Sequence, residues 1–454
     1  MSKLNAKQGP GKPFGAWAKA DGAPAPLSTS FVMLVAAFVC LATLAGVLKL
    51  FEWGPVRWAE VSAAFRQATI FAGPAAGLGG VFASRVFHMV VCGTAPGRTI
   101  GVIVSRHLAV LLTAGGLGYL VGLAPVVILA LARATAGGPD LVVMASGLAE
   151  FAAWAVLGYW VGSLVRFPYS LVAWVGAALL IWWLPLAAAH LASSPDRAFS
   201  TASVASWWDF TVPVGWHETA AVALLRACLF TSLALAAGLA AARVARPLVG
   251  VRWRDLARLM PPAAGLPAAL AVCALAFQPT VIAEGPERAL ACEERGSVAV
   301  CVDREVEALA APMAAVAAEA VERFGPGEFD SQAFSENASG YSGQSLHEVR
   351  AEYSQIAALE IVGFGACLPQ MRQAAERGDR QIADGPAIAS LLAEEIARRL
   401  NGQGPAPRYL GETTDSAETE QAVSEMSDQD LQEWIAHHRT QLASCSARPQ
   451  DMLP

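Results

Sequence analysis

Charged residues are scarce in this chain of 454 residues, and their scarcity indicates its class. Only 15% of the residues are charged, whereas 55% are hydrophobic. Soluble globular domains usually carry about 25% charged residues. Together with a mean hydropathy of +0.43, this composition predicts a membrane protein.

Lysine is absent after residue 50, and that absence excludes one kind of chemistry. Without a later lysine there is no GxxxxGK[ST] phosphate loop, so the chain alone cannot hydrolyse ATP by that mechanism. GxSxG and CxxC motifs are also missing, and no histidine and cysteine cluster has the spacing of metal ligands. The two His-Glu pairs, at 217–218 and 347–348, lack the second histidine of a metalloprotease helix. We therefore expect no catalytic centre, metal site or cofactor in this chain.

The charges that are present divide the chain in two. Residues 1–283 hold 19 lysines and arginines against 9 acidic residues, whereas residues 284–454 hold 13 against 29. The basic residues of the first part lie in short runs between apolar segments, which is typical of cytoplasmic loops and not of a nucleic-acid-binding face. We expect a cytoplasmic tail over 1–28, a transmembrane domain over 29–283 and an acidic domain over 284–454.

Seven apolar runs are candidates for membrane-spanning helices. Crossing about 30 Å of hydrocarbon at 1.5 Å per residue takes about 20 residues. The runs cover residues 30–50, 67–84, 108–132, 141–164, 169–189, 217–242 and 261–283. The second run contains four glycines and Pro74, which membrane helices tolerate and which suit close helix packing. Its alternative interpretation is a buried or re-entrant segment.

The basic residues of the short loops predict the orientation. With a cytoplasmic N-terminus, the inner segments hold 13 lysines and arginines and the outer loops hold 5, in agreement with the positive-inside rule. Seven crossings then place residues 284–454 outside the cell. We expect a multi-pass protein of the cell membrane with an extracellular C-terminal domain.

Four of the eight cysteines belong to the acidic domain. An even number of cysteines in an exported domain is typical of disulfides. Cys292 and Cys301 are separated by a turn-like segment that leads into a strand-like run, so we expect them to pair, which leaves Cys367 to pair with Cys445. The alternative is a set of reduced thiols in a cytoplasmic tail.

The acidic domain itself has mostly helical patterns. Amphipathic stretches run from about residue 303 to 324 and from about 346 to 361. A third helix is bounded by Asp384 as its cap and Gly402 as its stop, and a fourth begins near Ser427 and continues towards residue 445. The predicted fold class is therefore mainly α, with six membrane spans plus a seventh, followed by an α-rich extracellular domain.

Two ionisable residues lie inside the predicted spans. Glu150 is in the fourth span and Arg226 is in the sixth, each nine positions from the outer end of its run, which is about 13 Å at 1.5 Å per residue. Such groups are costly in a membrane unless they are paired or face a cavity. Their equal depth predicts an ion pair. The alternatives are two unrelated groups along a wet cavity, or an Arg226 side chain that extends to the nearer interface.

The connection between the second and third spans, residues 84–107, contains an apolar and basic stretch, a break with Gly and Pro, and a second stretch that leads into the third span. It resembles the coupling loop of ABC-2 type permeases, the membrane subunits of bacterial ABC exporters. On that resemblance, Arg85 belongs to the coupling helix, Pro96 and Arg98 match a Pro-x-Arg turn, and Arg106 matches the basic residue that opens the third span.

The resemblance implies a function and partners. Six spans with both ends inside are the family pattern, and residues 29–242 supply six. A permease of this type works as a homodimer or heterodimer with a separate P-loop ATPase, docked here at residues 84–107, and the ATPase holds the ATP and magnesium. The chain departs from the family in having no acidic residue in that loop, and in its seventh span and exported tail. The alternative function is that of a membrane-anchored binding or sensory protein of the same fold. A membrane-embedded enzyme is the third possible function.

Overall fold

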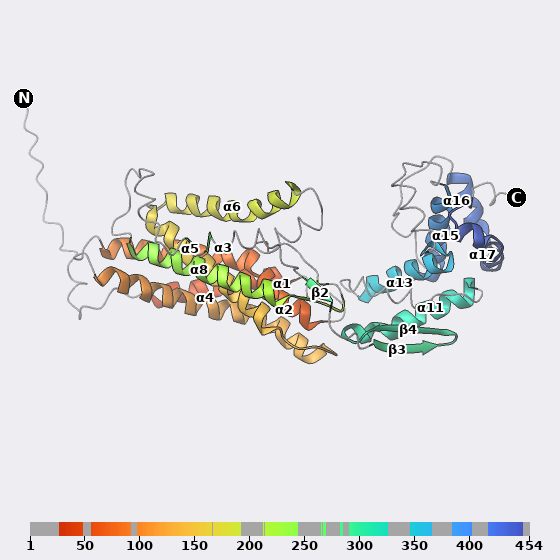
Figure 1. Cartoon of the computed structure of the whole chain (residues 1–454), viewed down its shortest axis with the longest axis horizontal. Helices are drawn as coiled ribbons and strands as arrows, with labels where there is room; N and C mark the ends of the chain where they lie inside the picture. The colour runs from red at the N-terminus through yellow and green to blue at the C-terminus, as the bar shows by residue number, and fades with distance from the viewer. Residues whose placement is uncertain are drawn as a thin grey trace, which may run out of the picture.

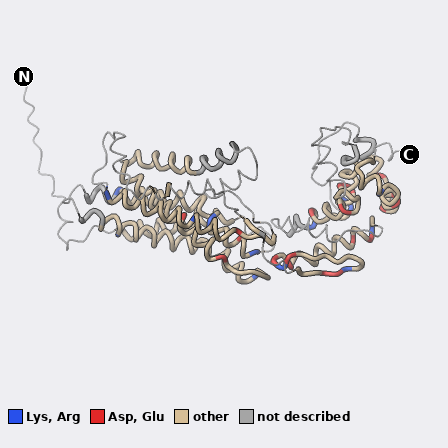
Figure 2. Tube along the Cα trace, viewed as in Figure 1, with Lys and Arg blue, Asp and Glu red and all other residues tan. Residues whose placement is uncertain are grey.

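The computed structural model describes residues 27–48, 56–91, 98–165, 167–191, 212, 214–243, 265, 267–268, 282–284, 290–325, 346–365, 384–401 and 416–447. They form a bundle of long helices joined at one end to a smaller body made by the acidic domain (Figure 1). The predicted mainly helical fold is confirmed. Figure 2 shows that Asp and Glu are concentrated in the smaller body and that few charges lie along the bundle.

The bundle contains most of the predicted spans as helices. Its long helices are α1 Thr29–Val47, α3 Thr69–Val91, α4 Arg98–Arg133, α5 Leu141–Leu164, α6 Tyr169–Leu191 and α8 Ala220–Arg243. Within the described residues, α1, α4, α5 and α8 are long and apolar enough to cross a membrane. The predicted seventh span, 261–283, lies mostly outside the described residues, as do residues 1–26 of the predicted cytoplasmic tail.

Polar caps define where two of these helices begin. The Asp140 carboxylate accepts hydrogen bonds from the backbone N–H groups of Val142 at 3.0 Å and Val143 at 3.1 Å. The Ser28 hydroxyl accepts from Phe31 N–H at 3.3 Å. Because the first amides of a helix have no intrahelical partner, these side chains satisfy them. Each polar residue directly precedes an apolar run, so α1 and α5 begin close to where the sequence predicts.

The glycines of the second predicted span let α3 and α5 approach closely. A Cβ atom added to Gly80 would lie 2.5 Å from the carbonyl oxygen of Ala155 and the nitrogen of Tyr159, and one added to Gly158 would meet the backbone of Gly77. Small residues permit this backbone-to-backbone contact between membrane helices. Pro74 lies inside α3 without ending it, so this run is a helix and not a break in the bundle.

A short helix, α2 Trp58–Gln67, precedes α3 and corrects the sequence analysis, which places residues 51–66 in an outer loop. Only Ala68 separates the two helices, and nearly every residue of α2 is buried. Charged residues made this segment look like a loop, but the charges of Arg57, Glu60 and Arg66 have partners inside the protein. Pairing therefore makes the burial of a polar helix possible.

Two short strands, β1 Trp216–Glu218 and β2 Ile282–Glu284, form an antiparallel sheet at the end of the bundle where α8 begins. The predicted sixth span begins at residue 217 and the predicted seventh span ends at residue 283, both inside this sheet, so these two boundaries need correction. Since α8 extends away from the sheet over 24 residues, about 36 Å at 1.5 Å per residue, the chain has returned to the same end of the bundle by residue 282.

The acidic domain builds its own core around a hairpin and helices (Figure 1). Its elements are β3 Leu290–Arg295, β4 Val298–Asp303, the 3-10 helix η4 Arg304–Leu309, α11 Ala310–Phe324, α13 Leu346–Ile361, α15 Asp384–Asn401, α16 Ser416–Glu425 and α17 Asp428–Ala443. The four predicted helices correspond to η4 with α11, and to α13, α15 and α17, whereas α16 was not predicted. Ser427 and Asp430 form a capping box at the start of α17.

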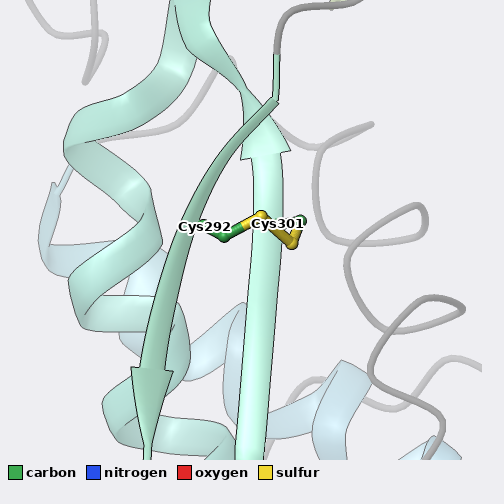
Figure 3. Close-up of a disulfide and its surroundings, with 2 residues drawn as sticks. All are labelled: Cys292 and Cys301. Atoms are coloured by element: carbon green, nitrogen blue, oxygen red, sulfur yellow. A yellow bond between two sulfur atoms is a disulfide. The ribbon is translucent and has the colours of Figure 1, made fainter.

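The hairpin carries a disulfide between Cys292 and Cys301, which lie directly opposite each other in β3 and β4 (Figure 3). This is the predicted pair. Cys445 is also disulfide-bonded, but its predicted partner, Cys367, lies outside the described residues. Cys40 in α1 and Cys228 in α8 are free thiols. Oxidised cysteines are therefore found in the acidic domain.

Candidate functional site

Charged and polar side chains gather at both ends of the bundle. The smaller body adjoins one end, where the Thr135 hydroxyl donates to the carbonyl oxygen of Arg304 at 2.6 Å. Helix α4 begins at the other end of the bundle, near the last residue of α3 (Figure 1), since this helix of 36 residues is about 54 Å long.

A group of four charged side chains is buried in the half of the bundle that adjoins the smaller body. We call it the buried charge cluster; its members are Arg66 from α2, Glu150 from α5, Glu218 from β1 and Arg226 from α8. Each is at most 4% exposed. Two basic and two acidic groups give the cluster no net formal charge, which limits the cost of burying it.

Glu218 is the acidic centre of the cluster. Its carboxylate accepts a hydrogen bond from Arg226, and its Oε2 atom lies 3.7 Å from Nε of Arg66. Glu150 lies beside this group, with its Oε1 atom 2.8 Å from the hydroxyl oxygen of Thr69. Because Thr69 begins α3, the cluster joins the α2–α3 break to α5, β1 and α8.

The structure places the predicted partners Glu150 and Arg226 in the same cluster, where their charges interact. Arg226 also forms an ion pair with Glu218. Sequence reasoning missed Glu218 and Arg66 because it treated the first as the end of a span and the second as part of a loop. The sequence pattern holds no signal for this contact, because it depends on α2 lying next to β1 in the folded protein.

A second polar group lies between the bundle and the smaller body. Arg57, 1% exposed, donates to the carboxylate of Glu60 and, at 2.8 Å, to the carbonyl oxygen of Val212. Its Nη1 atom is 3.9 Å from Oε2 of Glu305 in η4. Burial raises the pKa of both carboxyls, and Arg57 opposes the shift. We call Arg57, Glu60 and Glu305 the junction triad.

The opposite end of the bundle carries the predicted docking residues. Arg85, near the end of α3, is exposed, and its guanidinium lies 4.5 Å from the ring centroid of Phe167, which follows α5. Arg106 in α4 is also exposed. Arg98 is the first residue of α4, and Pro96 lies outside the described residues. The structure thus brings Arg85 to the α5–α6 connection, a contact that the sequence analysis did not anticipate.

Among the described residues, no three His, Cys, Asp or Glu side chains are grouped as a metal ion would require. No protein-family model, curated protein or solved structure matches this chain.

Proposed function

We propose that this chain is the permease subunit of an ABC-2 type exporter and works as a homodimer or heterodimer with a separate P-loop ATPase. The observation that carries the proposal is the pair of exposed arginines, Arg85 and Arg106, on the helices that flank the α3–α4 connection. That connection contains no acidic residue, so it suits a partner with an acidic docking surface. ATP and magnesium would be bound by the partner.

The cation–aromatic contact of Arg85 strengthens this choice of surface. Its guanidinium is positioned over Phe167, and such contacts contribute about 0.5–1 kcal/mol at exposed sites. A charge that is held in place loses less freedom when a partner binds. The docking surface would therefore extend from the α3–α4 connection to the α5–α6 connection.

The proposed topology places the docking surface in the cytoplasm and the acidic domain outside the cell. It is supported by the 13 basic residues of the proposed inner segments against 5 in the outer loops. Disulfides in the acidic domain also suit an oxidising compartment. The return of the chain to β2 at residue 282 is compatible with a seventh crossing before the acidic domain.

A membrane-anchored sensory or binding protein that does not transport is the second candidate. It is favoured by the contacts between the acidic domain and the bundle, through Arg57 with Glu305 and Thr135 with Arg304. Such contacts would let a ligand of the acidic domain act on the helices without any ATPase.

Affinity purification from native membranes distinguishes the two candidates. The tagged full-length chain, extracted in a mild detergent, should recover a P-loop ATPase. The double variant Arg85→Glu/Arg106→Glu should lower that recovery about tenfold, which corresponds to about 1.4 kcal/mol of binding free energy. Arg133→Glu is the matched control, because Arg133 is exposed at the other end of α4 and should leave recovery unchanged. Wild-type protein that recovers no ATPase would contradict the exporter proposal.

A further inference from the structure

The 3-10 helix η4 of the acidic domain contacts the bundle at several points. In η4, the carbonyl oxygen of Arg304 accepts from Thr135 at 2.6 Å, and the Glu305 carboxylate accepts from the backbone N–H of Gly215. Val214, from the same segment as Gly215, packs into the core of the acidic domain. Bundle segments that lie far apart in sequence therefore converge on η4.

The charges at this junction are unbalanced. Arg57 is the arginine between two carboxyls, and it is hydrogen-bonded to Glu60 and to the carbonyl of Val212. Its distance of 3.9 Å from Glu305 is too long for a hydrogen bond. Among the described residues, the buried Oε2 atom of Glu305 has no hydrogen-bond donor. The guanidinium of Arg57 thus lies between two carboxyls, and the charge of Glu305 is less well compensated than that of Glu60.

Among the residues that the structure describes, Asp303 and His217 are further titratable groups that face Glu305. Asp303 adds a third carboxyl, and its Oδ1 atom accepts from the Glu305 backbone N–H at 2.9 Å. His217, in β1, is exposed. With all carboxyls ionised and the imidazole neutral, the junction carries an excess of negative charge that water cannot fully solvate.

We propose that docking of the acidic domain on the bundle takes up a proton at the Glu60–Glu305 carboxyl pair, so that the junction closes in acid and opens as the pH rises. Opening separates Glu305 from Arg57 and Glu60 and returns the Glu305 carboxyl to water, while Glu60 stays paired with Arg57. Closing brings the Glu305 carboxyl to the arginine that already pairs with Glu60, and a proton on either carboxyl removes one of the excess negative charges. The pH then controls whether the acidic domain is docked on the helices.

The direction of the response follows from linkage. Burial raises the pKa of Glu60 and of Glu305 in the closed junction, with Arg57 lowering it less. A carboxyl with a raised pKa favours the closed state fully below its ordinary value of about 4.3 and loses that contribution as the pH rises through the raised value. If closing takes up one proton, the equilibrium constant for closing falls by up to about tenfold for each pH unit between the ordinary and the raised pKa.

The test is a distance measurement across the junction in the full-length chain in lipid nanodiscs. Nitroxide labels are attached at Arg133→Cys and Ala308→Cys, both exposed positions, in a background where Cys40, Cys92, Cys228 and Cys273 are replaced by serine. Pulsed electron spin resonance then follows the distance distribution from pH 4.5 to 8.5. We expect one short-distance population in acid, and a longer-distance population that grows as the pH rises.

Four variants make the outcome specific. Glu305→Gln and Glu60→Gln each remove one ionisable carboxyl, so either should hold the short distance across the whole pH range. Glu307→Gln is the matched control, an exposed glutamate of the same element, and should respond as the wild type does. His217→Gln should keep the response. A wild-type distance that is independent of pH, a response that survives Glu305→Gln, or one that disappears in His217→Gln would overturn the proposal.

Discussion

Arg226 donates a hydrogen bond to Glu218, eight residues earlier in the chain, and both side chains are almost completely buried. Glu218 belongs to β1 and Arg226 to α8, so the pair fixes the strand against the second turn of the helix that follows it. The second carboxylate oxygen of Glu218 faces Arg66 at 3.7 Å. One carboxyl group therefore holds α2, β1 and α8 together.

The first prediction concerns this ion pair. Removing one member of a buried pair leaves the other charge without compensation, which costs about 3–5 kcal/mol in soluble proteins and less where water or other partners relieve it. We expect Glu218→Gln and Arg226→Gln each to lower the thermal stability of the detergent-solubilised protein, and the double variant to recover part of the loss. The matched cycle of Glu150→Gln with Arg226→Gln should show weaker coupling. Additive losses for Glu218 and Arg226 would contradict the pairing.

The second prediction concerns the contact between α3 and α5. A Cβ on residue 158 would meet the backbone of Gly77, and backbone cannot be relieved by a change of rotamer. Gly158→Ala should therefore destabilise the bundle by about 1–3 kcal/mol, measured by thermal unfolding in detergent. Gly116→Ala is the control, because no atom lies near its added Cβ, and it should be neutral or stabilising by up to about 1 kcal/mol. Equal effects at both positions would exclude a close α3–α5 contact.

The third prediction concerns the redox state of the cysteines. When the purified chain is denatured without reductant, a thiol reagent should label Cys40 and Cys228 and should leave Cys292, Cys301 and Cys445 unlabelled. Prior reduction should make all five reactive, and mass spectrometry of the peptides identifies each. Labelling of Cys292 before reduction would show that the hairpin disulfide is absent.

The fourth prediction concerns the acid sensitivity of the acidic domain. Burial opposes ionisation of Asp428, but hydrogen bonds from Arg323 at 2.7 Å and Arg399 at 2.9 Å outweigh it and lower its pKa. A lowered pKa stabilises the fold above the ordinary value of about 3.9 and loses that effect as the pH falls through the lowered value. Asp428→Asn should therefore weaken resistance to proteolysis at pH 7 and reduce the further loss below about pH 4.

The control for that experiment is Glu433→Gln, an exposed residue of the same helix, α17. It should match the wild type across the same pH range. Wild-type and Asp428→Asn proteins with parallel pH profiles would show that the contacts of Arg323 and Arg399 do not carry the acid response.

Apolar runs with polar ends could be predicted well from the sequence. The structure has a helix at Leu141–Leu164, as predicted, because Asp140 supplies the cap and the run is unbroken. The disulfide between Cys292 and Cys301 could also be predicted, since a separation of nine residues with a turn between them suits two adjacent strands. These features depend on neighbours in the chain, which a single sequence displays.

Features that depend on distant partners could not be predicted. Helix α2 was taken for a loop because hydropathy counts Arg57 and Arg66 as exposed, whereas their partners Val212 and Glu218 lie about 150 residues later. Strand β1 was assigned to a span because its pairing with residues 282–284 leaves no local pattern. For the same reason the depth argument identified Glu150 and Arg226 but not the carboxyl of Glu218 between α2 and α8.

In the proposed topology the α3–α4 connection and the acidic domain face opposite sides of the membrane, and two single-cysteine variants distinguish the two sides. Ser105→Cys lies near the docking surface, and Gly138→Cys lies beside the junction with the acidic domain; both positions are exposed. A membrane-impermeant maleimide added to intact spheroplasts should label residue 138 at once and residue 105 only after the membrane is opened. Labelling of both residues from outside, or of residue 105 alone, would contradict the account.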